Sequence, residues 1–99
     1  MHRLAQRLFL VPLLALMLAA PAQAECYVDY KAKQDNPLRL AYGVSQVSED
    51  ACGKPKQAKA ELAPRLEADG WTLLKILSSF GPEGLGERKA SAGEFYLRY

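Results

Sequence analysis

The sequence has very little histidine and cysteine, and these shortages exclude most familiar catalytic and metal chemistry. Its single histidine is His2, and its only cysteines are Cys26 and Cys52. A serine or cysteine nucleophile usually needs a positioned imidazole as its base, and zinc sites use histidine and cysteine ligands. We therefore expect no catalytic residue, no metal site and no cofactor, and we expect that the protein is not an enzyme.

Weaker patterns for chemistry remain, and each has a simpler explanation. Lys89 and Ser91 could form a serine–lysine catalytic pair. They lie, however, in a segment rich in small and charged residues, which is typical of a mobile loop. The glycines of residues 84–86 precede a predicted strand rather than a helix N-terminus that would bind phosphate. The acids of residues 49–50 suit a solvated turn better than a calcium site. Two carboxylates acting on a sugar remain an alternative, but among 11 acidic residues some pairs lie close by chance.

Long apolar runs are also scarce, and the clearest one, residues 8–20, lies close to the N-terminus. Arg3 and Arg7 come before it, and residues 22–24, Ala-Gln-Ala, have the small-x-small pattern that signal peptidase cleaves. A helix needs about 20 apolar residues to span a bilayer, so the run is short for a membrane anchor. We predict that residues 1–24 are a cleaved signal peptide and that no stable membrane anchor remains after cleavage.

The remaining residues, 25–99, are predicted to form one small domain that is periplasmic or secreted. Without Arg3 and Arg7, the 13 basic residues fall to 11 and equal the 11 acidic residues. A nucleic-acid binder normally carries a basic excess, so we expect no nucleic-acid partner. An exported domain can keep a disulfide, and the cysteines lack the Cys-x-x-Cys spacing of a redox site. We predict a structural disulfide between Cys26 and Cys52.

Apolar periodicity predicts four strands and one helix in this domain. The strands are expected over 26–31, 38–44, 71–80 and 93–99, and the helix over about 55–69. The residues between the third and fourth strands, 81–92, are expected to form a mobile loop. We therefore predict an α+β fold with a four-stranded, mainly antiparallel sheet in ββαββ order. The helix packs on one face of this sheet and is kinked or broken at Pro64.

The strand predicted over residues 71–80 is apolar on both faces, which indicates a central strand or a sheet covered on both sides. Simple alternation assigns Leu74 and Ile76, with Thr72 and Phe80, to the face under the helix. It assigns Trp71, Leu73 and Leu77 to the opposite face. These three residues are the candidate interaction surface, covered by the 81–92 loop, a second copy of the chain or a partner protein. The alternative for Trp71 is a core position beneath the end of the helix.

Residues 62–80, with Leu-Glu-Ala-Asp-Gly-Trp-Thr-Leu-Leu at their centre, and the ending Phe-Tyr-Leu-Arg-Tyr carry a resemblance. They resemble a widespread bacterial family of unknown function, in which a helix ends in Gly-Trp and is followed by a strand and a terminal aromatic strand. The domain as a whole is similar to small uncharacterised exported proteins of alphaproteobacteria. The resemblance implies an α+β fold and no activity, and it supplies no catalytic residue.

These observations favour an exported, non-enzymatic interaction or structural module of unknown specific role. Its expected partner is an unidentified protein or a second copy of the chain, bound through a sheet face. The alternative is a secreted inhibitor or binding protein for a cell-envelope enzyme, with the 81–92 loop inserted into a cleft. A carboxylate-based hydrolase is the third hypothesis.

Overall fold

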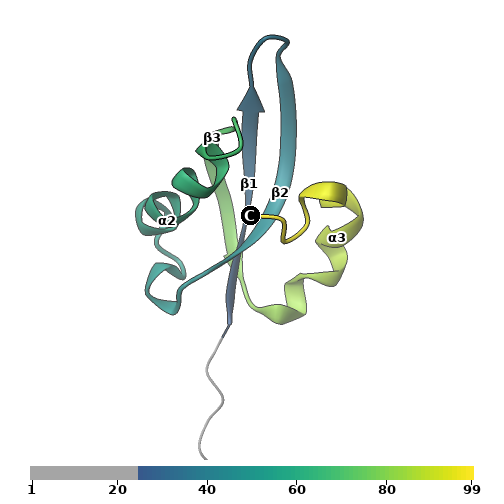
Figure 1. Ribbon diagram of the computed structural model, residues 1–99. Coiled ribbons are helices and arrows are strands. Elements are labelled where there is room, and N and C mark those ends of the chain that lie inside the picture. Colours follow the sequence, from purple (N-terminus) through teal and green to yellow (C-terminus); the bar gives the residue numbers. More distant parts are fainter. Residues whose placement is uncertain (1–24) are drawn as a thin grey trace, which may run out of the picture.

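The structure, a computed structural model, describes residues 25–99; the predicted signal peptide of residues 1–24 lies outside the described residues. The described part is α+β, with a three-stranded antiparallel sheet and two α-helices (Figure 1). The strands are β1 (Cys26–Gln34), β2 (Arg39–Val47) and β3 (Thr72–Phe80), and the helices are α2 (Pro55–Glu67) and α3 (Gly86–Ala92). The α+β class is confirmed, whereas the number of strands and the order of elements differ from the prediction.

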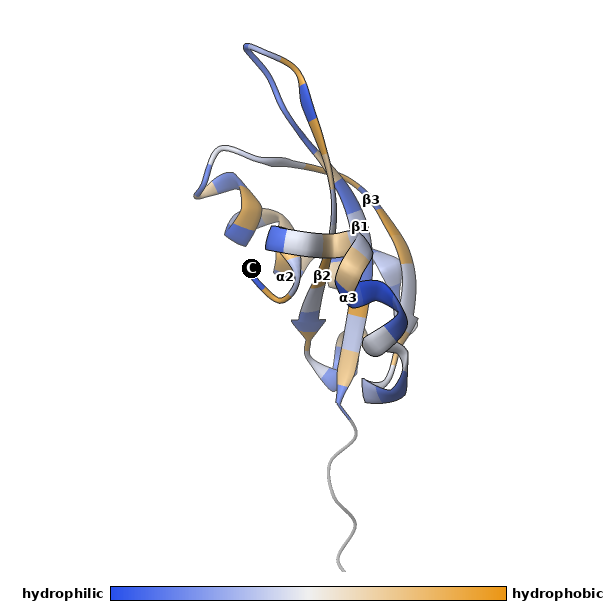
Figure 2. Ribbon diagram, turned by 90° about the vertical axis from the view of Figure 1, so that its right-hand side faces the viewer, coloured by the Kyte–Doolittle hydropathy of each residue, from blue (hydrophilic) through white to orange (hydrophobic). Residues whose placement is uncertain are grey.

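The strand order is β2-β1-β3, and both outer strands run antiparallel to β1. The two helices cover opposite faces of the sheet, as Figures 1 and 2 show from two directions. We predicted that residues 71–80 form a central strand or belong to a sheet covered on both sides. The second interpretation holds, because β3 is an outer strand of a sheet that has a helix on each face.

Alternate residues of β1 enter two separate cores, which explains why this strand is the central one. Val28, Tyr30 and Ala32 are fully buried in the main core, under α2. Tyr27 enters a smaller core under α3, together with Val44. Burying each large apolar side chain contributes about 1.5–3 kcal/mol, so two covered faces give this short chain more core than a sheet with one helix.

The hairpin between β1 and β2 extends beyond both helices, and we call residues 34–40 the arm (Figures 1 and 2). Pairing between β1 and β2 continues to Gln34, whereas pairing between β1 and β3 ends at Lys33. The turn at the tip contains a cis Asn36–Pro37 bond and a positive φ at Asn36, a residue that tolerates this conformation. The arm is therefore the end of the hairpin, the turn and the strand ends next to it, with no third strand beside it.

Helix α2 packs on the sheet through Ala58, Leu62 and Leu66, the apolar stripe that the sequence predicts. It begins at Pro55, which suits the first helical position because that N–H needs no intrahelical partner. Of the two alternatives predicted at Pro64, the break is wrong, because the helix continues through this residue to Glu67, and the kink stays a prediction. Pro64 lies in the last turn, where its missing N–H removes only one hydrogen bond of the helix.

The segment between β3 and the C-terminus forms helix rather than the predicted loop and fourth strand. Residues 81–92 contain the short 3₁₀ helix Pro82–Gly84 followed by α3, and Gly93–Phe95 is another 3₁₀ turn. No fourth strand forms within residues 25–99, because Leu97 has a φ of 55° and breaks the extended conformation. The segment instead meets the outer edge of β2, where the Leu97 N–H donates to the Val44 carbonyl at 2.8 Å. It thus protects part of that edge from unwanted pairing.

Two irregularities in the pairing of β3 with β1 change which residues face each helix. The register shifts skip Leu77 and Leu74, so that Ile76 pairs with Tyr30 and Leu73 with Ala32. A bulge of this kind places two residues of one strand opposite one residue of its neighbour and resets the alternation. The predicted division of this strand is therefore wrong for Leu73, which faces α2, and for Leu74, which is exposed. It agrees with the structure for Ile76, which packs against the core under α2, and for Leu77, which is exposed.

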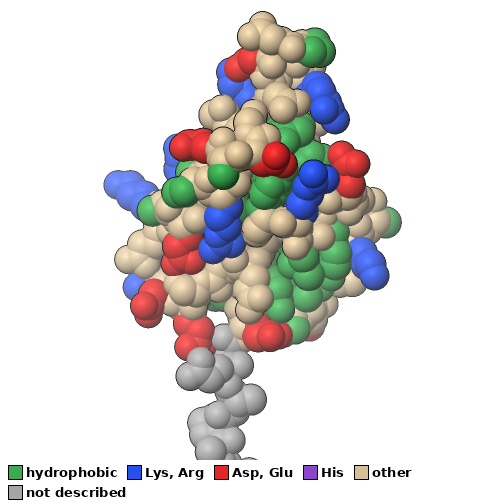
Figure 3. All heavy atoms as spheres, in the orientation of Figure 1, with side chains coloured by type: hydrophobic (Ala, Val, Ile, Leu, Met, Phe, Trp, Pro, Cys, Tyr) green, Lys and Arg blue, Asp and Glu red, His purple; other side chains and the backbone are tan. Residues whose placement is uncertain are grey.

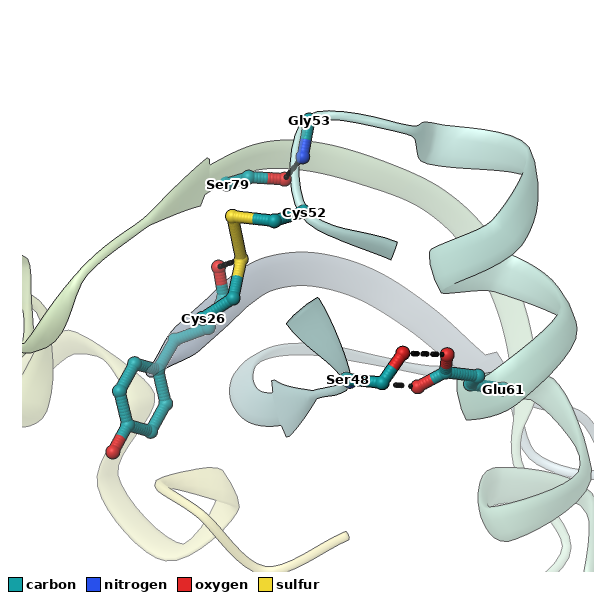
Figure 4. The surroundings of a disulfide bond; sticks show 7 residues. Cys26, Ser48, Cys52, Gly53, Glu61 and Ser79 are labelled. Atoms are coloured by element: carbon teal, nitrogen blue, oxygen red, sulfur yellow. Dashed lines mark hydrogen bonds between the residues drawn. A yellow bond between two sulfur atoms is a disulfide. The ribbon is translucent and has the colours of Figure 1, made fainter. Parts of the chain in front are cut away.

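The predicted disulfide between Cys26 and Cys52 is present, with the two Cα atoms 5.7 Å apart (Figure 4). It ties the first residue of β1 to the turn before α2. Beside it, the Gly53 N–H donates to Ser79 Oγ on β3 at 3.2 Å. The Ser48 N–H and hydroxyl both donate to the carboxylate of Glu61 on α2, the N–H at 2.9 Å. The connection from β2 to α2 is thereby fastened to both the sheet and the helix.

Candidate protein-binding surface

The three residues predicted to form an interaction surface do not lie together. Trp71 is 5% exposed and Leu73 is 6% exposed, and both belong to the main core under α2. The Trp71 ring packs edge-to-face against Phe95, with ring centroids 5.0 Å apart. Only Leu77, at 39%, is exposed. Trp71 therefore takes the core position that was the alternative in the sequence analysis.

The opposite face of the sheet, the one that carries α3, contains a buried polar cluster around Asp29. The Asp29 carboxylate is in the middle of the central strand, and the residue is 7% exposed. It accepts hydrogen bonds from the Tyr42 hydroxyl at 2.8 Å, the Ser78 hydroxyl at 2.6 Å and Arg88 Nε at 3.2 Å. These donors come from β2, β3 and α3, so the carboxylate links the three elements around it. We call these four residues the Asp29 cluster.

The protonation of the Asp29 cluster follows from its partners. Burial raises the pKa of the Asp29 carboxyl, but hydrogen bonds from Ser78, Tyr42 and Arg88, together with the Arg88 charge, outweigh it. The pKa of Asp29 therefore lies below its ordinary value, and the carboxylate is ionised at neutral pH. Burial, followed by the hydrogen bond to Asp29, raises the pKa of Tyr42 to about 12, so its hydroxyl remains a donor.

Arg88 holds α3 against the sheet through several contacts. Besides Asp29, its guanidinium donates to the Gly84 carbonyl at 2.8 Å and to the exposed carboxylate of Glu87 at 2.7 Å. It also lies over the ring of Phe80 at 4.0 Å from the centroid, a favourable cation–π arrangement. The Asp29–Arg88 pair is therefore a fixed structural contact, and its carboxylate is already engaged by three donors.

Helix α3 covers only part of its face of the sheet, and a groove remains between the helix and the arm. Its first part is an open hollow of about 590 Å³ beside α3, lined by Lys31, Tyr42, Glu87, Arg88 and Ser91. Its second part is a hollow of about 250 Å³ toward the arm, lined by Lys31, Ala32, Leu40, Ala41, Tyr42 and Leu74. The two parts share Lys31 and Tyr42 and are therefore adjacent. We call them together the α3-side groove.

Two exposed leucines flank the second part of the groove. Leu40, on β2, is 73% exposed, and Leu74, at one of the β3 irregularities, is 46% exposed. Another leucine in the arm, Leu38, is 65% exposed. Figure 2 looks onto this side of the molecule and shows hydrophobic segments along the projecting arm, and Figure 3 shows hydrophobic side chains at the surface among charged ones. Apolar side chains that gather beside a groove are typical of a binding surface.

The charges on this side of the sheet are unbalanced at two lysines. Lys31 on β1 pairs directly with Lys75 on β3, and no ion pair within residues 25–99 involves either of them. Like charges opposite each other on neighbouring strands destabilise a sheet by roughly 0.2–1 kcal/mol. The nearby cations differ, because Lys33 pairs with Asp35 and Arg88 pairs with Asp29. Lys31 therefore adds an unpaired positive charge to the groove, because the acidic residue of its lining, Glu87, is paired with Arg88. Lys75 adds a second unpaired charge beside Lys31 on β3.

The other chemical patterns of the sequence do not assemble into a site. Of the two glycines in residues 84–86, Gly84 ends a 3₁₀ turn and Gly86 begins α3, which corrects the predicted strand, but this helix is only 7 residues long. Lys89 lies over the ring of Tyr96, 5.6 Å from its centroid. Within residues 25–99, no group of His, Cys, Asp and Glu side chains has the geometry to hold a metal ion. In the same part of the chain, no helix is both long and apolar enough to cross a bilayer.

Comparisons of the chain with protein-family models, curated proteins and solved structures find no match. The resemblance of residues 62–80 and of the C-terminal residues to a bacterial family therefore stays a prediction.

Proposed function

We propose that the protein is an exported, non-enzymatic binding module that recognises another protein through the α3-side groove. Residues 1–24 have the composition of a signal peptide, and the Cys26–Cys52 disulfide suits an oxidising compartment such as the periplasm or the exterior. A domain of this size has a small core, so a disulfide is a substantial part of its stability.

The observation that carries the binding role is the uncovered part of the sheet between α3 and the arm. Leu40 and Leu74 expose apolar surface on both sides of a hollow, although the same sheet buries comparable residues elsewhere. The absence of histidine from residues 25–99 and the engagement of Asp29 by three donors support a role without catalysis. A protein partner that covers the two leucines would remove this apolar surface from water.

Export is tested by expressing the protein with its residues 1–24 and measuring the mass of the product in the envelope fraction. The expected polypeptide begins at Glu25 and contains no free thiol. Retention of Met1 in that fraction, or recovery of the protein only from the cytoplasm, would contradict export.

Binding is tested by placing a photoreactive amino acid at Leu40 or Leu74 in cells and irradiating them. We expect adducts of discrete size from these two positions. Lys56 and Lys59, which are exposed on α2, serve as matched controls and should give none. Adducts from α2 and none from the groove would refute the proposed surface, and adducts of twice the protein's mass would identify a homodimer.

A secreted inhibitor of an envelope enzyme remains the second candidate, because the arm projects with Leu38 exposed near its tip. Residues 81–92, the predicted inserting segment, pack on the sheet as helix, so the arm is the better candidate for entering a cleft. Substituting Leu38→Ser should abolish adducts if the tip enters a cleft. The same substitution should leave them unchanged if the partner lies in the groove beside Leu74.

A further inference from the structure

We propose that the α3-side groove binds an extended peptide segment of the partner in which acidic side chains alternate with apolar ones. This inference rests on the proposed function and specifies the chemistry of the partner.

The charge of the groove argues for acidic side chains. Lys31 and Lys75 lie opposite each other on adjacent strands, about 4.8 Å apart in the sheet, without a carboxylate partner among the described residues. A carboxylate placed over them would interact with both cations and relieve their mutual repulsion. The other basic groups that border this region, Lys33 and Arg88, already have acidic partners within the fold.

The apolar lining argues for hydrophobic side chains next to those carboxylates. Leu40 and Leu74 lie on opposite sides of the smaller hollow, and Lys31 lies between them on the central strand. Side chains of an extended peptide alternate between its two faces at about 3.3 Å per residue. An extended peptide that crosses the strands, with its side chains directed along them, turns one face toward the arm and the other toward α3. Its apolar side chains then meet Leu40 and Leu74, and its carboxylates meet Lys31 and Lys75, which lie farther from the arm.

The chain's own N-terminal segment and a second copy of the domain fit this groove less well. Residues 1–24 contain Arg3 and Arg7 and no acidic residue, so their charge has the same sign as the two lysines. Within residues 25–99, no strand or exposed segment alternates acidic with large apolar residues along its length. An acidic segment from another protein is thus the occupant that complements the groove.

The test measures fluorescence anisotropy of short labelled peptides with the purified protein at low salt. One peptide alternates Glu and Leu, a second has Lys in place of Glu, and a third has Ser in place of Leu. We expect saturable binding of the first peptide only, with an affinity that falls as salt rises. Equal binding of the Glu and Lys peptides, or binding of none, would overturn the proposal.

Charge reversal at the groove supplies the matched comparison. Lys31→Glu with Lys75→Glu should weaken binding of the Glu–Leu peptide by about tenfold or more and favour the Lys peptide instead. Lys56→Glu with Lys59→Glu on α2 changes the net charge equally and should leave binding unchanged. The same loss in both variants would show that only overall charge matters and would refute the groove.

A single substitution separates lost binding from lost folding. Lys31→Glu places a carboxylate opposite Lys75, so the variant should resist urea at least as well as the natural protein while its binding of the Glu–Leu peptide falls. Groove adducts in cells without peptide binding would leave the proposed function standing and reject the acidic peptide. If the adducts consist of two copies of the chain, the groove is a self-association surface and the peptide proposal fails.

Discussion

Replacing Asp29 with asparagine should be among the most destabilising changes of a single charge in the domain. The substitution keeps the size of the side chain but removes the negative charge that faces Arg88. One amide oxygen remains to accept hydrogen bonds where the carboxylate accepts three. Hydrogen bonds to charged groups contribute about 1.5–3 kcal/mol each, and an unpaired buried partner adds to the loss.

The magnitude is limited by the position of Arg88. Its side chain is 23% exposed and keeps its contacts with Glu87 and Gly84, so water and these groups compensate part of the loss. We therefore expect Asp29→Asn to lower the free energy of unfolding by about 2–4 kcal/mol. The fluorescence of Trp71, the only tryptophan, reports unfolding in urea. The urea midpoint measured in this way should fall by roughly 1–3 M.

A matched control and the pH dependence test the cause of this loss. Asp50→Asn removes the same charge from an exposed position and should change stability by less than about 0.5 kcal/mol. The pKa of Asp29 is lower in the folded protein than in the unfolded chain. The carboxylate therefore contributes its full stabilisation to the folded protein above the unfolded-state pKa of about 3.9, and this stabilisation disappears as the pH falls through the folded-state pKa. The difference between the natural protein and Asp29→Asn should therefore narrow below about pH 4. Equal stability of the two proteins at pH 7 would refute the role of the Asp29 cluster.

Three further substitutions test the core and the disulfide. Cys26→Ser should cost about 3.5 kcal/mol through the lost loop closure and leave Cys52 open to thiol labelling, whereas unchanged stability would show that the disulfide is dispensable. Trp71→Ala should cost about 3–5 kcal/mol with no change of mass in light scattering; a change of oligomeric state with little loss of stability would instead make Trp71 an interface residue. Gly43→Ala should destabilise by about 1–3 kcal/mol, because its Cβ would clash with the hydroxyl and the ring edge of the buried Tyr30, whereas unchanged stability would show that the ring can move aside.

Features encoded by local residue patterns could be predicted from the sequence. The first two strands follow the alternation on both sides of the turn, and α2 follows the spacing of Ala58, Leu62 and Leu66. The disulfide was predictable because only two cysteines are available. These elements depend on neighbouring residues or on a single possible pairing, so tertiary context does not alter them.

The faces of β3 and the C-terminal segment depend on contacts that local patterns do not contain. Skipping Leu74 and Leu77 keeps β3 paired with β1, and this reverses the expected face of Leu73. Helix α3 has glycine at its start and only 7 residues, so its intrinsic signal is weak, although Leu85, Arg88 and Ala92 have helical spacing. Its packing against the second core supplies the stability that the isolated segment lacks.

The candidate binding site was the least predictable part, because its residues are far apart in the chain. Asp29 lies 13 residues from Tyr42, 49 from Ser78 and 59 from Arg88. The sequence does place Asp29 between Val28 and Tyr30 in a strand of largely apolar and aromatic residues, and a buried carboxylate there needs donors from elsewhere. Which residues supply them, and which part of the sheet remains uncovered, depends on the fold.

The central claim is that the groove between α3 and the arm is the recognition surface. It is tested most directly by recording amide chemical shifts of the labelled protein while the Glu–Leu peptide is added. The amide shifts should saturate together in residues 31–33, 40–42, 72–75 and 88–91, and those of α2 should not change. Shifts concentrated on α2, or none at concentrations where anisotropy reports binding, would contradict recognition through the groove.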